Sequence, residues 1–147
     1  LNAARDLNGT WKGTGIYYYA DIATGRRLRT VTEDVTMQVE QKDNAVTATM
    51  VKRIVKQDPA GTVSVKNAAG NERYALMPAE AENVTVKGTA SVTNLTLATV
   101  NTPGYTDQWQ FTFTTDLMSG GFRTQMSGEV LFEIKSDPKA YNLVRQK

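Results

Sequence analysis

The chain has 147 residues, no cysteine, no histidine and a formal net charge of +2 at neutral pH. This length fits one domain, residues 1–147, which can bury a core without disulfide bonds. The missing residue types exclude thiolate chemistry, Ser-His-Asp and Cys-His catalysis and zinc sites, and the small net charge does not favour nucleic acid as a partner. No stretch approaches the roughly 18 apolar residues of a membrane-spanning helix, so no transmembrane segment is expected.

We interpret residues 1–7 as a loose N-terminal segment. The chain starts at Leu1 without an initiator methionine, as a chain does after a signal sequence is removed, or after trimming. Thr-rich, cysteine-free β-domains resemble prokaryotic secreted proteins. We therefore expect a secreted, periplasmic or envelope-anchored location, the last as a lipoprotein.

Alternating apolar and polar residues predict β-strands along most of the chain. The alternation is clearest in 31–40 and 108–114, and it indicates strands with one buried and one wet face. Abundant Thr and Val favour the same structure. The expected strands lie near residues 9–20, 29–40, 44–56, 61–67, 72–77, 83–90, 92–100, 105–115, 122–135 and 140–145.

Turn residues separate these strands at 42–44, 58–61, 67–71, 102–104 and 119–121. Short strands joined by sequential hairpins favour an up-and-down barrel over a sandwich, because closure leaves no exposed sheet edge. We predict an all-β fold: a single antiparallel up-and-down β-barrel of about eight to ten strands.

The hairpin between residues 29 and 56 predicts a buried charge pair. If its turn is centred on Lys42-Asp43, Val39 pairs with Val46, and Glu33 faces Lys52 on the apolar side. This pair is either a salt bridge at the rim of the barrel or a polar anchor for a ligand head group inside it. A slip by two residues would keep the faces and break the pairing.

Aromatic residues supply the second candidate feature. Trp11, Gly13, Gly15, Tyr17 and Tyr19 share one face of the first strand, and glycines in a strand mark bending or close approach of another group. The aromatic rings either fill the core or line a pocket for an amphipathic ligand. The predicted ligand-binding residues are Tyr17, Tyr19, Glu33, Met37, Met50, Lys52, Trp109 and Phe111, with Val35 and Phe113 as further candidates for the lining.

Gly9-Thr10-Trp11 at the first strand resembles the Gly-X-Trp signature of the lipocalins. The resemblance implies that Trp11 closes one end of the barrel and that a late basic residue, here Arg145, packs across its indole. The segment 109–128 is similar to hairpins of lipocalin-like domains in prokaryotic secreted proteins. Thr106-Asp107-Gln108 matches only part of the lipocalin Thr-Asp-Tyr motif, so the resemblance favours the broader calycin-like group of barrels.

Two functions follow from these expectations. The first is non-catalytic binding of a small hydrophobic or amphipathic molecule, which requires a cavity of about 300 Å³ or more. The alternative is a filled barrel that binds a protein partner through its loops or N-terminal segment, as barrel-type protease inhibitors do. The carboxylates form no recognisable catalytic pair, so we expect no enzymatic activity, no cofactor and no metal site.

Overall fold

The computed structural model describes residues 5–75, 77–128 and 130–147, and this part of the chain contains strands but no helix. None of it therefore offers a helix that could span a membrane. The strands in chain order are β1 (Gly9–Asp21), β2 (Arg27–Lys42), β3 (Ala45–Asp58), β4 (Val63–Lys66), β5 (Glu72–Ala75), β6 (Ala81–Ala90), β7 (Asn94–Thr99), β8 (Tyr105–Phe113), β9 (Leu117–Met126), β10 (Phe132–Lys135) and β11 (Tyr141–Arg145).

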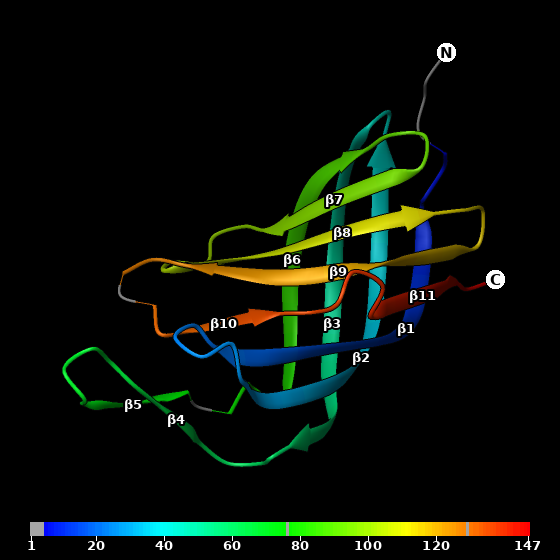
Figure 1. Ribbon diagram of the computed structural model, residues 1–147. Helices are drawn as coiled ribbons and strands as arrows, with labels where there is room; N and C mark the ends of the chain where they lie inside the picture. The colour runs from blue at the N-terminus through cyan, green and yellow to red at the C-terminus, as the bar shows by residue number, and fades with distance from the viewer. Residues whose placement is uncertain (1–4, 76, 129) are drawn as a thin grey trace.

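The main sheet closes on itself as an antiparallel barrel with up-and-down neighbours, as the sequence predicts (Figure 1). β1, β2, β3, β6, β7, β8 and β9 follow one another around it, and β10 and β11 share the eighth position between β9 and β1. β3 and β6 run crosswise behind β7, β8 and β9. The long strands β1 and β2 bend to join the two layers, so the barrel has no free edge.

The predicted strand 122–135 and the predicted turn at 119–121 are wrong. Gly120 and Gly121 lie inside β9, and the β8–β9 turn falls at residues 114–116. A β-carbon on Gly120 would lie 2.0 Å from the carbonyl oxygen of Gln110 on β8, so this glycine permits close approach of two strands. The chain then leaves the sheet after Met126 and returns at β10.

The expected register of the β2–β3 hairpin is wrong by two residues. Val39 lies opposite Ala48, and the turn is centred on Asp43-Asn44. Asp43 has a φ of 54°, in the left-handed region that Asp tolerates better than most residues. Because side chains alternate with a period of two, the shift leaves every residue on its predicted face.

The shift separates the predicted charge pair. Lys52 lies opposite Val35, and Glu33 lies opposite Ile54, next to a bulge at which Val55 of β3 is the extra residue. Both charged side chains still point inward, with exposed fractions of 2% for Glu33 and 8% for Lys52. The two charges therefore share the barrel interior without forming the predicted cross-strand pair.

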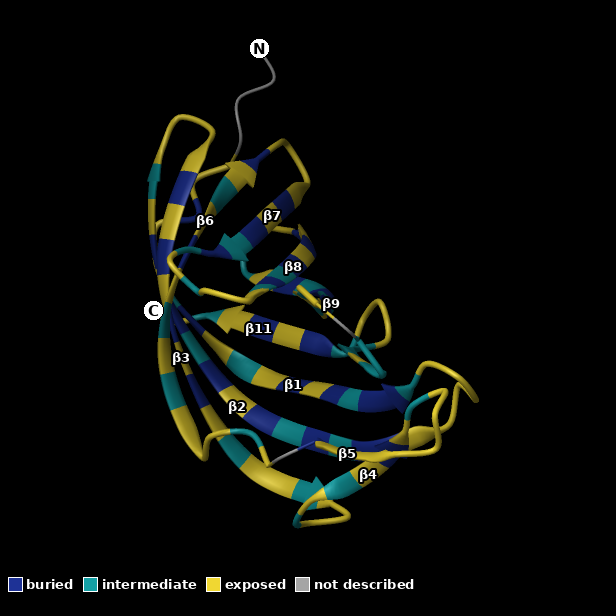
Figure 2. Ribbon diagram, turned by 90° about the vertical axis from the view of Figure 1, so that its left-hand side faces the viewer, coloured by how far each residue is buried: buried dark blue, intermediate teal, exposed yellow. Residues whose placement is uncertain are grey.

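The segments predicted as strands 61–67 and 72–77 do not join the barrel. They form β4 and β5, a separate two-stranded sheet, which lies beside the end of the barrel where β1 finishes and β2 begins (Figures 1 and 2). Val65 and Ala75 of this hairpin are buried in the same hydrophobic cluster as the barrel interior. The hairpin therefore packs against this end of the barrel, which we call the open end.

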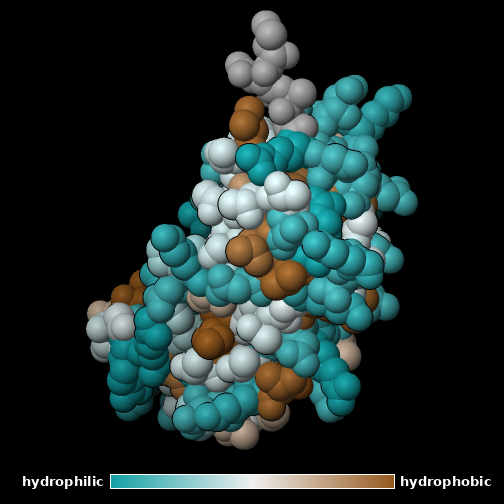
Figure 3. All heavy atoms as spheres, turned by 90° about the vertical axis from the view of Figure 1, so that its right-hand side faces the viewer, coloured by the Kyte–Doolittle hydropathy of each residue, from teal (hydrophilic) through white to brown (hydrophobic). Residues whose placement is uncertain are grey.

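Large apolar side chains pack the other half of the barrel. The strands show alternating buried and exposed bands in Figure 2, and the buried bands form one cluster. Its largest fully buried apolar residues are Trp11, Trp109, Tyr141, Phe111, Leu7, Met37, Met50, Leu95, Leu97, Met118 and Leu143. On the side drawn in Figure 3, hydrophobic atoms form separate small patches among polar ones.

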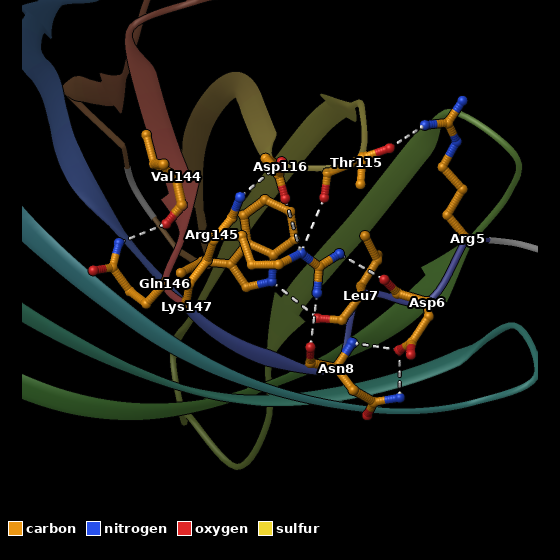
Figure 4. Close-up of polar contacts among 11 residues, drawn as sticks. Arg5, Asp6, Leu7, Asn8, Thr115, Asp116, Val144, Arg145, Gln146 and Lys147 are labelled. Carbon is orange, nitrogen blue, oxygen red and sulfur yellow. Dashed lines mark hydrogen bonds and ion pairs between the residues drawn. The ribbon is translucent and has the colours of Figure 1, made fainter.

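Arg145 closes the packed end (Figure 4). Its guanidinium carbon lies 4.5 Å from the ring centroid of Trp11, which is the contact that the lipocalin resemblance implies. The guanidinium also donates to three main-chain carbonyl oxygens: those of Asn8 at 2.8 Å, Asp6 at 2.6 Å and Thr115 at 3.0 Å. One side chain thus joins the chain's two ends and the β8–β9 turn.

The N-terminal segment, which the structure describes from residue 5 onward, contacts the packed end of the barrel. Leu7 is fully buried, its amide donates to the Gln41 side chain at 2.7 Å, and its carbonyl accepts from the Trp11 indole at 2.9 Å. An apolar side chain and the Arg145 contacts hold residues 5–7 on the barrel, although these residues form no strand. Residues 1–4 lie outside the described part.

Candidate functional site

The open end of the barrel contains a pocket of about 430 Å³. This exceeds the roughly 300 Å³ at which small-molecule sites begin. β1, β3, β6, β8, β9 and β10 all contribute side chains to it. Its lining residues are Tyr17, Tyr19, Lys52, Pro78, Glu82, Pro103, Gly104, Tyr105, Asp107, Phe122, Thr124, Met126, Ser127 and Ile134.

Aromatic rings form one wall of this pocket. Tyr17 and Tyr19 project inward from β1 with ring centroids 6.3 Å apart, and Phe122 of β9 meets Tyr17 edge-on at 5.4 Å. Tyr19 also stacks on Phe132, with centroids 5.7 Å apart. Burial raises the pKa of Tyr17 far above its ordinary value of 10.0, so its hydroxyl stays neutral and this wall is uncharged.

Lys52 brings a positive charge into the pocket from β3. Its ammonium nitrogen lies 5.4 Å from the Trp109 ring centroid and 5.9 Å from that of Phe122. The nearest carboxylate oxygen in the described chain is Oε2 of Glu82, at 4.0 Å. Ring faces, the Glu82 carboxylate and the more distant carboxylates of Glu33 and Asp107 therefore stabilise this ammonium, and it makes no hydrogen bond to a described residue.

Asp107 brings a buried carboxylate into the same pocket from β8. The residue is 7% exposed, and its Oδ1 accepts a hydrogen bond from the Thr124 hydroxyl at 2.6 Å. Its backbone amide donates to the Thr99 hydroxyl at 3.0 Å, which fixes the strand at this point. Burial raises the pKa of the Asp107 carboxyl, while the Thr124 hydrogen bond and Lys52 act in the opposite direction.

Glu33 lies next to the pocket residues but deeper in the barrel. Its Oε2 accepts a hydrogen bond from the hydroxyl of the fully buried Tyr141 at 2.6 Å. Tyr141 reaches Glu33 across Gly15, which pairs with Glu33 in the sheet and offers no side chain to obstruct the ring. Burial raises the pKa of Glu33, and Lys52 and the Tyr141 hydrogen bond partly offset that rise.

The raised pKa of Glu33 predicts a pH-dependent stability. Between the ordinary carboxyl pKa of 4.5 and the higher folded pKa, the folded state binds more protons than the unfolded state. The free energy of unfolding from this group therefore falls as the pH rises through that window. Glu33→Gln should remove the fall, so urea titrations from pH 4 to pH 8 should show the variant gaining stability relative to the original protein.

Asp34→Asn is the matched control, because Asp34 is the next residue and is exposed on the outer face of β2. This control should leave the pH profile unchanged. An equal change in both variants, or a Glu33→Gln protein that loses stability relative to the original protein as the pH rises, would contradict the burial effect on Glu33.

The structure divides the predicted ligand-binding residues into two groups. Tyr17, Tyr19 and Lys52 line the pocket, and Glu33 lies beneath it. Met37, Met50, Trp109 and Phe111 belong to the packed half and do not line this pocket, and the same is true of the candidates Val35 and Phe113. They point inward as predicted, but large side chains from opposite strands meet there and fill the space.

Sequence reasoning missed Glu82 and Asp107. The alternation pattern could have identified both residues. Asp107 lies two residues before Trp109 on β8, and Glu82 lies four residues before Val86 on β6, so each shares the inward face of its strand. A charged residue in an inward position of a barrel strand is a candidate for the lining of a wet interior. The pattern showed the direction of these side chains but not which end of the barrel was hollow.

A second hollow, of about 610 Å³, lies on the outside of the barrel between β8, β9 and residues 135–139. Its charged side chains are Arg123, Lys135 and Lys139, and none of them is buried. Lys135 is paired with Glu133 at 2.9 Å. Buried charges and rings come together in the open end instead, so we place the candidate site there.

No protein-family model, curated protein or solved structure matches this chain. The fold is a closed eight-stranded antiparallel barrel of a kind compatible with the calycins. No cluster of three metal-ligating side chains occurs in residues 5–75, 77–128 and 130–147.

Proposed function

We propose that this protein binds a small amphipathic molecule in the open end of its barrel, without transforming it. The observation that carries the proposal is the aromatic-walled pocket of about 430 Å³, into which Lys52 and Asp107 project while largely buried. Charged groups are buried at a cost unless they are paired. Here the two charges face a space of ligand size, where a bound polar group can replace the water they have lost.

We propose further that the barrel is lipocalin-like and acts in a secreted, periplasmic or envelope location. The Gly9-Thr10-Trp11 signature and the packing of Arg145 on Trp11 support the first part. Closure of one end by these residues leaves the opposite end for a ligand to enter. Rings for an apolar body and charges for a polar group suit a ligand with both.

Blocking the pocket tests this function. We expect the neutral dye N-phenyl-1-naphthylamine to bind with one-to-one stoichiometry, reported by its fluorescence increase in an apolar site. Met126→Trp replaces the methionine side chain with the larger indole ring and so fills part of the pocket. It should weaken dye binding at least about tenfold, the equivalent of about 1.4 kcal/mol.

Leu117→Trp is the control, because Leu117 is on the same strand β9 but is exposed, with an exposed fraction of 57%. It should bind the dye like the original protein. Dye binding that is absent, or that both variants reduce equally, would contradict a ligand site in the open end. Native mass spectrometry of protein purified from its own host would then identify a natural ligand as a reproducible extra mass.

A further inference from the structure

The charges of the open-end pocket do not balance. Among its described lining residues, Lys52 supplies one ammonium, and Glu82 and Asp107 supply two carboxylates. Two more charged groups lie nearby and offset each other formally: Glu33 beneath the pocket, and Arg29, whose guanidinium carbon lies 5.2 Å from the Tyr19 ring centroid. The lining therefore has an excess of one negative charge.

The excess belongs to Asp107. Lys52 is closer to Glu82, at 4.0 Å, and no described cation comes within 4.0 Å of the Asp107 carboxylate. The Thr124 hydroxyl donates a hydrogen bond to Oδ1 of Asp107, while no described donor bonds to Oδ2. Asp107 is 7% exposed as a residue, and its side chain lines the pocket. Its Oδ2 is an acceptor that no described donor contacts, and burial raises the pKa of this carboxyl.

The walls suit a positive charge as well. The negative faces of aromatic rings attract cations, and the pocket presents the rings of Tyr17, Tyr19, Tyr105 and Phe122. The protein already uses this interaction at the pocket, because the Lys52 ammonium lies over Trp109 and Phe122 and the Arg29 guanidinium lies over Tyr19. A second ammonium beside Asp107 would have both a carboxylate and ring faces.

We infer that the ligand of this pocket is an organic monocation: an amine with an aromatic or other apolar body. Its ammonium donates to Oδ2 of Asp107, and its body packs against Tyr17, Tyr19 and Phe122. This inference rests on the proposed function, because it requires the pocket to bind a small molecule. One positive charge on the ligand neutralises the lining.

Three probes with the same indole ring test the inference: tryptamine, which is a cation, tryptophol, which is neutral, and indole-3-acetate, which is an anion. Isothermal titration calorimetry at neutral pH should show tryptamine binding at least about tenfold tighter than each of the others, as a charge-assisted hydrogen bond predicts. Equal affinities, or tighter binding of indole-3-acetate, would overturn the inference and leave the proposed function standing. No binding of any indole probe would overturn the inference, and it would overturn the proposed function too if N-phenyl-1-naphthylamine also fails to bind.

The Asp107→Asn variant tests whether Asp107 causes the preference for the cationic probe. Asparagine keeps an acceptor for Thr124 and removes the charge, so the ratio of tryptamine to tryptophol affinity should fall about tenfold. Asp34→Asn, on the outer face, removes a carboxylate without touching the pocket and should keep the ratio. A ratio that stays the same in Asp107→Asn would overturn the assignment of this residue, and circular dichroism would show that both variants are folded.

Discussion

Replacing Arg145 with alanine should lower the free energy of unfolding by about 3 kcal/mol, because hydrogen bonds from a charged donor and a cation–π contact are lost together. The guanidinium donates to three main-chain carbonyl oxygens and lies over Trp11. Its side chain is 18% exposed, so water replaces these contacts poorly. Urea unfolding followed by tryptophan fluorescence measures the loss.

Two controls separate the network from the charge. Arg145→Lys keeps the charge but cannot donate in three directions from a planar group, so it should recover less than half of the loss. Arg5→Ala removes another arginine at the same end, one that makes a single exposed hydrogen bond to Thr115, and should change stability by less than about 0.5 kcal/mol. Equal effects of Arg5→Ala and Arg145→Ala would contradict the role assigned to Arg145.

Gly15→Ala should also destabilise the barrel, by about 3 kcal/mol. A β-carbon at this position would lie 2.1 Å from Cε2 of Tyr141. The ring cannot easily move away, because it is fully buried and its hydroxyl is bonded to Glu33 at 2.6 Å. Thermal unfolding by circular dichroism measures the loss, and Thr14→Ala, at the neighbouring exposed position, should have a small effect.

A double-mutant cycle identifies the cause of the loss. Tyr141→Leu removes the ring and destabilises the protein by itself, since it leaves the Glu33 carboxylate without its donor. Gly15→Ala should cost much less in that background, giving a coupling energy of at least about 1 kcal/mol. Strictly additive costs would show that the methyl group of alanine acts through something other than the Tyr141 ring.

The Arg145 and Gly15 variants test the packed half of the barrel, where side chains occupy the interior. Arg145 fixes the packed end, and the Tyr141–Glu33 contact lies between the packed half and the pocket. A barrel filled from one end and hollow at the other presents one entrance. The β4–β5 hairpin packs beside that entrance, and Pro78, which follows it in the chain, contributes to the lining.

The alternation pattern was enough to predict the barrel and the direction of its side chains. Period-two patterns in β2, β3 and β8 determine which residues face inward, and that holds for Glu33, Lys52 and Trp109. Even the error in the β2–β3 register left the faces unchanged, because it was an even number of residues. The direction of a side chain in a strand depends only on local backbone geometry, so it can be predicted from the sequence.

Local pattern could not show which strands pair across the break between β10 and β11, or why Gly15 and Gly120 lie in strands. These glycines make room for groups distant in the sequence: the Tyr141 ring for one and the Gln110 carbonyl for the other. Their role depends on contacts between strands, and a sequence window that contains only one strand does not show the other.

The sequence by itself determined a single all-β barrel, the inward faces of its strands and the pairing of Trp11 with Arg145 that the lipocalin resemblance implied. Only the tertiary structure decided where the barrel is filled and where it is hollow, and so brought Lys52, Glu82 and Asp107 into one pocket. The physical reason is that alternation fixes the direction of each side chain, whereas volume depends on how side chains from opposite strands meet.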